Sequence, residues 1–368
     1  MELKANDPLI LAAIAIIIIG AIILVDSTKA NIGAPEPIVV DKSGFQKAPE
    51  LTGLAGYINT DSNISLSALE GKVVLIDFWT YSCINCIRTI PYLNSWHEKY
   101  ADDGLVIIGV HSPEFEFEKK KENVQNAVDE YNIKYQVVLD NDFATWRAYA
   151  NRYWPHKFLV DAQGYIRYDH IGEGSYGETE EKIVELLKEK NSAPDDQMGL
   201  AEIEGTDFSK IATPEIYFGY NFFRPQSPQI GNIEGVHTEQ QTAYEYPSRA
   251  SRETFRDNTP YLGGTWTVLG DYSKLNSETG MVGLVFTAKK ANIVAGAPKG
   301  AQLTIMLDGA QILESEYGSD VELADGKPIV RISEQRLYNI VDAKNYSKKT
   351  LEFKISGEGF ELYTFTFG

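Results

Sequence analysis

The residues of this sequence that could carry out chemistry are its two cysteines, Cys83 and Cys86. They lie three positions apart, directly after the apolar run 73–79 and where a helix is expected to begin. On the first turn of a helix this spacing places both sulfur atoms on one face, within the Cα separation that a disulfide accepts. The sequence therefore predicts a pair of thiols that can open and close as a redox-active disulfide.

The position of each cysteine predicts its role. Cys83 is nearer the start of the helix, where unpaired N–H groups and the helix dipole favour a thiolate, so we expect it to attack a substrate disulfide. Cys86 lies one turn deeper and is expected to resolve the mixed disulfide, which requires an acceptor for its proton. Asp77, in the middle of the apolar run, is the candidate, because burial moves the pKa of a carboxyl group toward neutrality. The alternative is that Asp77 pairs with a lysine such as Lys72.

One proline and three large ring-bearing residues extend the predicted site. Pro155 precedes the strand expected at 157–160, where a cis bond would bring its backbone beside the sulfur atoms to align an extended substrate segment. An ordinary trans proline at a strand entrance is the alternative. Trp79 and Trp154 are expected to shield the sulfur atoms, unless they pack in the core. His156 is expected to flank the site. Trp79, Trp154 and His156 are therefore the predicted substrate-binding residues.

The elements that must position these residues alternate between strand and helix. Runs of apolar and β-branched residues predict buried strands, and apolar residues at helical spacing predict helices. Strands are expected at 73–79, 105–110, 135–139, 157–160 and 165–170, and helices at about 87–100, 118–131, 143–152 and 178–190. Pro91 lies inside the first helix and is expected to kink it. The alternation predicts an α/β domain over residues 48–190.

From residue 214 onward the helical period gives way to period-2 alternation. Asp308-Gly309 is typical of a hairpin turn, and further turns are expected at 263–264, 297–300 and 356–359. The pattern predicts an all-β sandwich of the jelly-roll kind over residues 214–368, joined to the α/β domain by a polar linker at 191–213. Three aromatic residues of this domain could form a stacking platform for a glycan, or pack in its core: Tyr261, Trp266 and Tyr272.

The N-terminal segment is strongly apolar. Residues 9–25 form an uncharged run of 17 residues, about enough helix to cross a bilayer. We expect residues 1–25 to be a membrane anchor, or a cleaved signal segment, followed by a linker at 26–47. A lone N-terminal anchor most often leaves the rest of the chain outside the cytoplasm, and a cleaved segment would leave it secreted.

The composition excludes several classes of function. The 52 acidic residues outnumber the 34 basic ones, which gives a net charge of −18, so nucleic acid is not expected as a partner. Two cysteines and five histidines do not provide a disulfide framework or a Cys/His metal cluster. We expect no cofactor besides the Cys83–Cys86 disulfide.

Residues 48–190 resemble thioredoxin-fold proteins, with Asp77, the Cys-Ile-Asn-Cys pair, Pro91 and Pro155 at the spacing typical of that fold. Three segments resemble one group of these proteins more specifically: WTYSCINCIRTIPYLNSWHEKY, GVHSPEFEFE and LDNDFATWRAYANRYWP. They are similar to the thioredoxin-like region of cytochrome c biogenesis proteins of the DipZ/TlpA type. The stretch from TPEIYFGY to GFELYTFTFG resembles their C-terminal β domain, whose architecture is similar to that of carbohydrate-binding modules.

The resemblance implies an extracytoplasmic thiol–disulfide oxidoreductase that reduces protein disulfides in thiol homeostasis or cytochrome c maturation. DipZ-type proteins also carry a multi-span membrane domain that conducts electrons. In this sequence a single apolar segment stands in its place, which implies a separate membrane electron donor.

Alternative functions follow from other features. The chain could be a glycan- or protein-binding module that carries an accessory redox domain. It could also be a thiol peroxidase, because Thr80 lies three residues before Cys83, although Ile76 replaces the upstream proline of that pattern. A copper chaperone is disfavoured by the narrow cysteine spacing.

Overall fold

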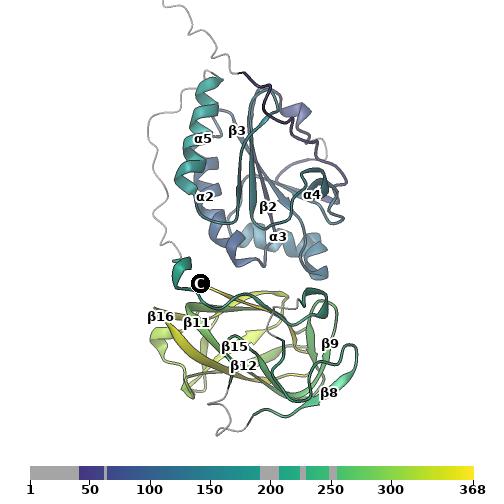
Figure 1. The fold of residues 1–368 in the computed structure, drawn as a ribbon, viewed down its shortest axis with the longest axis vertical. Helices are drawn as coiled ribbons and strands as arrows, with labels where there is room; N and C mark the ends of the chain where they lie inside the picture. Colours follow the sequence, from purple (N-terminus) through teal and green to yellow (C-terminus); the bar gives the residue numbers. More distant parts are fainter. Residues whose placement is uncertain (1–40, 62–63, 191–206, 224–228, 248–254) are drawn as a thin grey trace, which may run out of the picture.

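The computed structural model describes residues 41–61, 64–190, 207–223, 229–247 and 255–368. Two sheets organise them, and Figure 1 shows the α/β region (residues 41–190) above the β region (residues 207–368), with the C-terminus between the two. The apolar run 9–25 and most of the expected linker at 191–213 lie outside the described residues. Within the described ranges, no helix is both long and apolar enough to span a bilayer.

The α/β region contains a six-stranded sheet with the order β1-β4-β3-β2-β5-β6. β2 pairs in parallel with β3 and antiparallel with β5. The strands are β1 (Gly56–Ile58), β2 (Val73–Trp79), β3 (Leu105–His111), β4 (Gln136–Leu139), β5 (His156–Val160) and β6 (Ile166–Ile171). The helices are α2 (Ile84–Tyr100), α3 (Lys121–Glu130), α4 (Ala144–Ala148) and α5 (Tyr176–Glu189). The expected thioredoxin-like arrangement is confirmed.

Local backbone geometry explains where the expected helices differ. The helix expected at 118–131 is divided into a 3-10 turn, Glu116–Lys119, and α3. The helix expected at 143–152 is limited to the short α4 because Phe143 and Ala150, on either side of it, adopt the left-handed conformation with φ of 56° and 49°. Such residues interrupt a right-handed helix.

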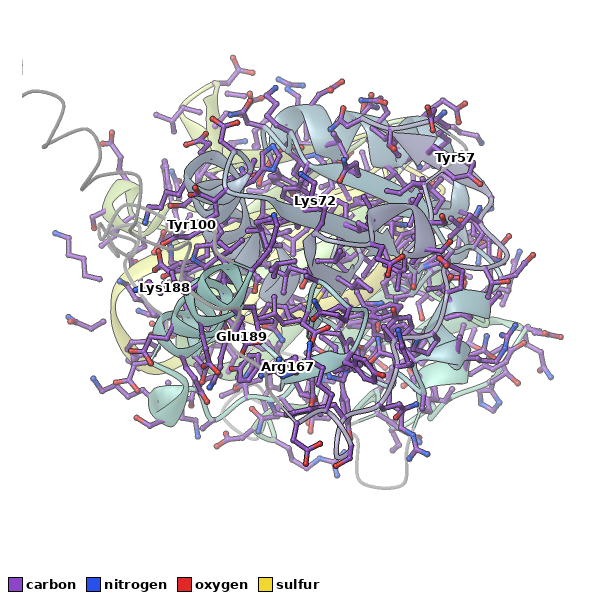
Figure 2. All side chains as sticks on the ribbon, turned by 90° about the horizontal axis from the view of Figure 1, so that it is seen from above. Tyr57, Lys72, Tyr100, Arg167, Lys188 and Glu189 are labelled. Atoms are coloured by element: carbon purple, nitrogen blue, oxygen red, sulfur yellow. The ribbon has the colours of Figure 1, made fainter. Side chains whose placement is uncertain are left out.

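An ion pair joins the last strand and the last helix of this sheet. The Arg167 guanidinium on β6 makes two bonds to the Glu189 carboxylate at the end of α5, at 2.8 and 2.9 Å. Figure 2 shows the two side chains next to each other. Paired bonds of this kind fix both position and orientation, so α5 is held against the sheet.

The β region is one connected sheet of eleven strands, which confirms the all-β prediction. The long strand β11 pairs with β17 over residues 291–296 and with β9 over residues 281–283, so the sheet curls on itself. Its strands are β7 (Ile216–Tyr217), β8 (Gln241–Tyr244), β9 (Tyr261–Val268), β10 (Ser273–Leu275), β11 (Thr279–Gly296), β12 (Ala301–Leu307), β13 (Ala310–Gln311), β14 (Glu322–Ala324), β15 (Lys327–Ile332), β16 (Arg336–Ser356) and β17 (Glu361–Phe367).

The glycines in this sheet show both a correct and a wrong prediction. Asp308 and Gly309 have φ of 53° and 77° and join β12 to β13, as the hairpin prediction requires. The turn expected at 263–264 is wrong, because both glycines lie inside β9. A Cβ atom at Gly263 would stand 2.6 Å from Tyr246 Cβ, and one at Gly264 would stand 2.8 Å from a backbone oxygen. These glycines allow close packing rather than a chain reversal.

Of the two possibilities for these aromatic residues, a glycan platform or core packing, the structure supports core packing for Tyr261 and Trp266. Trp266 is fully buried, and its Nε1 donates to the Gly263 carbonyl oxygen at 2.9 Å. Tyr261 is buried with its ring stacked on Phe255. Tyr272 is half-buried, with its ring centroid 4.9 Å from that of Tyr363. These rings therefore pack against other side chains of the protein, as the alternative in the sequence analysis stated.

One buried hydrophobic cluster contains residues of both regions. Val294 and Tyr363 of the β region belong to the same buried cluster as the side chains of β2 and α2. The ring of Phe115 is nearly inaccessible, and its centroid lies 5.1 Å from that of Tyr363 and 5.4 Å from that of Phe222. Buried aromatic rings contribute much of the stabilising free energy of such an interface. The β region is therefore packed onto the α/β region.

Candidate functional site

The two cysteines lie at the start of α2. Cys83 is the residue that caps the helix, and its carbonyl oxygen accepts from Ile87 N at 3.0 Å. Its side chain is half-buried, whereas Cys86 is 1% exposed. Both are thiols in the structure. Burial raises the pKa of the Cys86 thiol, and the adjacent Cys83 and Asp77 raise it further. The arrangement presents one accessible thiol and one protected thiol that must lose a proton before it can react.

Asp77 lies beneath the cysteines because side chains of a strand alternate between faces. The odd-numbered residues of β2 pack with α2, and the even-numbered ones pack on the opposite side of the sheet with α4. Asp77 is odd-numbered and 2% exposed. Burial raises its pKa to about 7, although the charge of Lys157 opposes this. Its Oδ1 has no hydrogen-bond partner among the described residues. A carboxyl group of this kind can exchange a proton near neutral pH.

The lysine that faces Asp77 is Lys157 rather than Lys72. The two residues occupy paired positions on β2 and β5. The Lys157 side chain is fully buried, its Nζ donates to the Gly172 carbonyl oxygen at 3.1 Å, and burial lowers its pKa. The sequence contained a signal for this residue, a charged side chain at the start of the apolar run KFLV, but the pairing of β2 with β5 was needed to connect it with Asp77.

Replacing Lys157 with methionine is expected to raise the pKa of Asp77 further above about 7. The reason is that the positive charge of Lys157 stabilises the ionised carboxylate in the folded protein. A titration of carboxyl carbons by NMR, with Asp77→Asn to assign the resonance, measures this pKa directly. A value unchanged or lowered in Lys157→Met would contradict the electrostatic connection between the two residues.

A groove of about 410 Å³ opens beside Cys83. Both regions of the protein contribute side chains to it. The α/β region supplies Cys83, Asn85, Glu114, Arg152, Tyr153 and Trp154, and the β region supplies Pro214, Glu215, Tyr217 and Phe222. The sequence did not indicate the contribution of the β region, since these residues are more than 130 positions away from Cys83 along the chain.

Trp154, which lines the groove together with Cys83, directly precedes Pro155. The peptide bond between them is cis. Trp154 is half-buried, and its Nε1 donates to the Ser112 carbonyl oxygen at 3.0 Å. The Pro155 carbonyl oxygen accepts one hydrogen bond within the molecule, from Gly172 N at 2.8 Å. Of the predicted substrate-binding side chains, Trp154 is the one that lines the groove.

The structure places the other two predicted substrate-binding side chains in the interior. Trp79 is 1% exposed and belongs to the core beneath α2. His156 is also buried, with Nδ1 2.7 Å from Asn151 Oδ1 and Nε2 3.0 Å from Asp169 Oδ2. Neither side chain is accessible to a substrate in this conformation. His156 instead holds the loop before Pro155 through its contact with Asn151. Trp79 packs in the core, which is the alternative that the sequence left open.

Three residues of the groove share protons. Tyr217 Oη lies 2.8 Å from Glu114 Oε1 and 3.0 Å from Glu215 Oε2. A hydroxyl group has one proton, so both contacts are hydrogen bonds only when one carboxyl group is also protonated. Burial, together with the charge of Glu215, raises the pKa of Glu114 to about 8. The wall of the groove beside Cys83 therefore holds a proton at neutral pH.

Comparison with known families divides the chain into the same two parts. Residues 45–169 match the AhpC/TSA family, and residues 213–368 match the thioredoxin-like C-terminal domain family. The chain is 34% identical over 335 residues to protein DipZ of Mycobacterium tuberculosis, in an alignment that covers 87% of this chain and 43% of DipZ. The chain thus spans less than half the length of that relative.

Two shorter relatives match the α/β region. The thiol-disulfide oxidoreductase YkuV of Bacillus subtilis is 30% identical over 145 residues, which cover 39% of this chain and 96% of YkuV. The thiol-disulfide oxidoreductase ResA of Halalkalibacterium halodurans is 32% identical over 126 residues, which cover 34% of this chain and 68% of ResA.

Proposed function

Since this chain belongs to the thioredoxin-like thiol-disulfide oxidoreductases, we propose that it is an extracytoplasmic enzyme that reduces disulfides of other proteins. One observation carries the proposal. A half-buried thiol, Cys83, opens into a groove, while a buried thiol, Cys86, lies behind it with a carboxyl group, Asp77, whose pKa is about 7.

The mechanism that fits this arrangement has two exchange steps. The Cys83 thiolate attacks one sulfur of the substrate disulfide, the substrate S–S bond breaks, and the other substrate sulfur leaves as a thiolate and takes up a proton. Cys86 then gives its proton to Asp77 and attacks the Cys83 sulfur, which releases the second substrate thiol. Two electrons pass to the substrate, and Cys83 and Cys86 end as a disulfide. No further cofactor is needed.

The bend at Trp154 and Pro155 is proposed to align the substrate. Trp154 lines the same groove as Cys83, and its indole is fixed by the bond to Ser112. Because Trp154 lines the groove and the Pro155 carbonyl oxygen already accepts from Gly172 N, the backbone of Trp154 is the proposed contact for an extended substrate segment.

The direction of electron flow is tested by the reduction potential. We expect the Cys83–Cys86 couple to lie near the reducing thioredoxin value of about −270 mV rather than near the oxidising DsbA value of about −120 mV. Equilibration of the protein with glutathione buffers, followed by quantification of free thiols, measures it. Reduction of insulin by the dithiol form is the matching activity assay.

A potential at the oxidising end would contradict the reductase assignment. The thiol peroxidase alternative is supported by the AhpC/TSA match but not by Thr80, which is fully buried with its hydroxyl 3.4 Å from His111 Nε2. Rapid peroxide turnover that survives Cys86→Ser would favour the peroxidase over disulfide exchange.

The proposal also covers the location of the protein, its substrates and the role of the β region. The apolar run 9–25 supports a membrane anchor that leaves residues 48–190 and 214–368, the two proposed domains, outside the cytoplasm. The proposed substrates are protein disulfides in thiol homeostasis or cytochrome c maturation. For the β region we propose a jelly-roll-like sandwich that supports the redox site, since its contacts with the groove favour this role over glycan binding.

A further inference from the structure

We propose that Glu118 is a positioning residue for Cys83, and that through Glu118 the packing of the β region fixes the position of the nucleophilic sulfur. The inference rests on the proposed function, because it concerns the same pair of cysteines. It assigns a task to a buried carboxyl group that the exchange mechanism does not use.

The Glu118 carboxylate joins two loops. Its side chain is fully buried. Oε1 accepts from Ser82 Oγ at 2.6 Å and from Ser82 N at 3.4 Å. Oε2 accepts from Glu114 N at 2.5 Å and from Phe115 N at 2.9 Å. Each oxygen therefore serves a different loop, and the carboxylate holds the two loops together.

A carboxylate is required for this geometry. Burial raises the pKa of Glu118, but four donors converge on its two oxygens, and an ionised carboxylate is the form that only accepts. Glutamine has the same length but offers one acceptor oxygen and one donating amide group. Glu118→Gln would therefore keep the volume and leave either the Ser82 loop or the Glu114–Phe115 loop without its acceptor.

One of the two loops carries the nucleophile. Ser82 directly precedes Cys83, and both belong to a turn that is closed by a bond from Cys83 N to the Thr80 carbonyl oxygen at 3.3 Å. Ser82 itself is buried. The bonds from Ser82 to Glu118 thus fix the residue adjacent to Cys83, at the point where α2 begins.

The other loop is held by the β region. The Phe115 ring packs edge-to-face against Phe222 and Tyr363, at centroid distances of 5.4 and 5.1 Å. The backbone N–H of the same residue donates to Glu118. A continuous series of contacts therefore runs from the β region through Phe115 and Glu118 to Ser82. In the sequence Glu118 is one of several charges in a polar run, so only the tertiary contacts identify it.

Restricting the loop should favour the Cys83–Cys86 disulfide. In the reaction with oxidised glutathione, two protein thiols form one disulfide and two molecules of reduced glutathione are released. The equilibrium constant rises when Cys83 is held near Cys86, because less conformational freedom is lost on closing the bond. Glu118 is thus expected to make the pair more reducing.

The test is this equilibrium constant in Glu118→Gln. We expect it to fall about tenfold, which corresponds to a potential about 30 mV more oxidising. The matched control is Glu180→Gln on α5, where a carboxylate that is also buried accepts from Tyr100 Oη at 2.7 Å and from Lys99 Nζ at 3.1 Å. The control is expected to stay within twofold of the wild type, because Glu180 does not contact the cysteine loop.

Two further variants test the connection. Ser82→Ala is a smaller change, and we expect it to lower the constant severalfold on its own but to add nothing in the Glu118→Gln background. Phe222→Ala, in the β region, is likewise expected to lower the equilibrium constant on its own and to add nothing in the Glu118→Gln background. If the equilibrium constant of a double variant is the product of the two single effects to within twofold, the inference is overturned. An unchanged constant in Glu118→Gln would also overturn it, provided that the wild type reduces disulfides. A wild type that exchanges no disulfides would instead overturn the proposed function.

Discussion

Cys86→Ser is expected to accumulate as a covalent complex with its substrate protein through Cys83. The variant retains the accessible nucleophile but lacks the buried thiol that releases the product, so the reaction stops at the mixed disulfide. Multiple turnover in the insulin assay should fall at least about a thousandfold. Non-reducing electrophoresis of cells that express the variant, followed by mass spectrometry of reducible adducts, measures the trapped species and identifies it.

The matched control for this trap is Cys83→Ser. The 1% exposure of Cys86 predicts that the remaining thiol cannot reach an incoming protein, so this variant should form no adduct. Adducts that form equally through Cys86, or a Cys86→Ser protein that forms none although Cys83 is readily alkylated, would contradict the order of attack that we propose.

Asp77→Asn is expected to slow the release of the mixed disulfide about 100-fold at pH 7, because Cys86 then lacks its proton acceptor. The pKa of about 7 predicts that in the wild type this step accelerates as the pH rises through 7, when the carboxylate becomes available. Stopped-flow measurement of the release step against pH checks both expectations. A release rate in Asp77→Asn with the wild-type magnitude and pH dependence would rule Asp77 out as the base.

The same variant is expected to be more stable than the wild type. Asp77 ionises near pH 3.8 when unfolded and near 7 when folded, so the folded state binds the proton more tightly. Stability conferred by this protonated group is therefore lost progressively as the pH rises from about 4 to 7. Asparagine does not ionise, so Asp77→Asn should exceed the wild type by up to about 4 kcal/mol above pH 7 and match it near pH 3.

Urea denaturation at several pH values separates this effect from a packing effect. A stability difference that does not depend on pH would show that Asp77 is not the titrating group. The combination of higher stability and lower activity would indicate that the buried carboxyl group is retained for chemistry, at a cost to the fold.

The hydrophobic cluster that contains residues of both regions explains why side chains of both regions line the groove. Phe115 of the α/β region packs against rings of the β region, and Tyr217 of the β region bonds to Glu114 beside Cys83. The β region therefore contributes side chains to the groove beside Cys83, where we propose that the substrate binds. This arrangement is consistent with a supporting role in substrate recognition.

The sequence alone determined the features that depend on local order. The strand over 73–79, the helix that follows it and the thiol pair at their junction could all be predicted, because hydrophobic periodicity and helix position are properties of neighbouring residues. Asp77 could be identified for the same reason, as a charge inside an apolar strand. The hairpin at Asp308-Gly309 was correct because its backbone needs positive φ at both positions.

The tertiary structure alone decided which distant residues meet. Lys157 reaches Asp77 only because β5 pairs antiparallel with β2, and Tyr217 reaches the groove only because the β region packs on Phe115. The burial of Trp79 and Trp266 was likewise undecided, since an aromatic residue in a strand serves a core or a surface equally well until its neighbours are known. Periodicity gives the face of an element, whereas contacts between elements depend on how the whole chain packs.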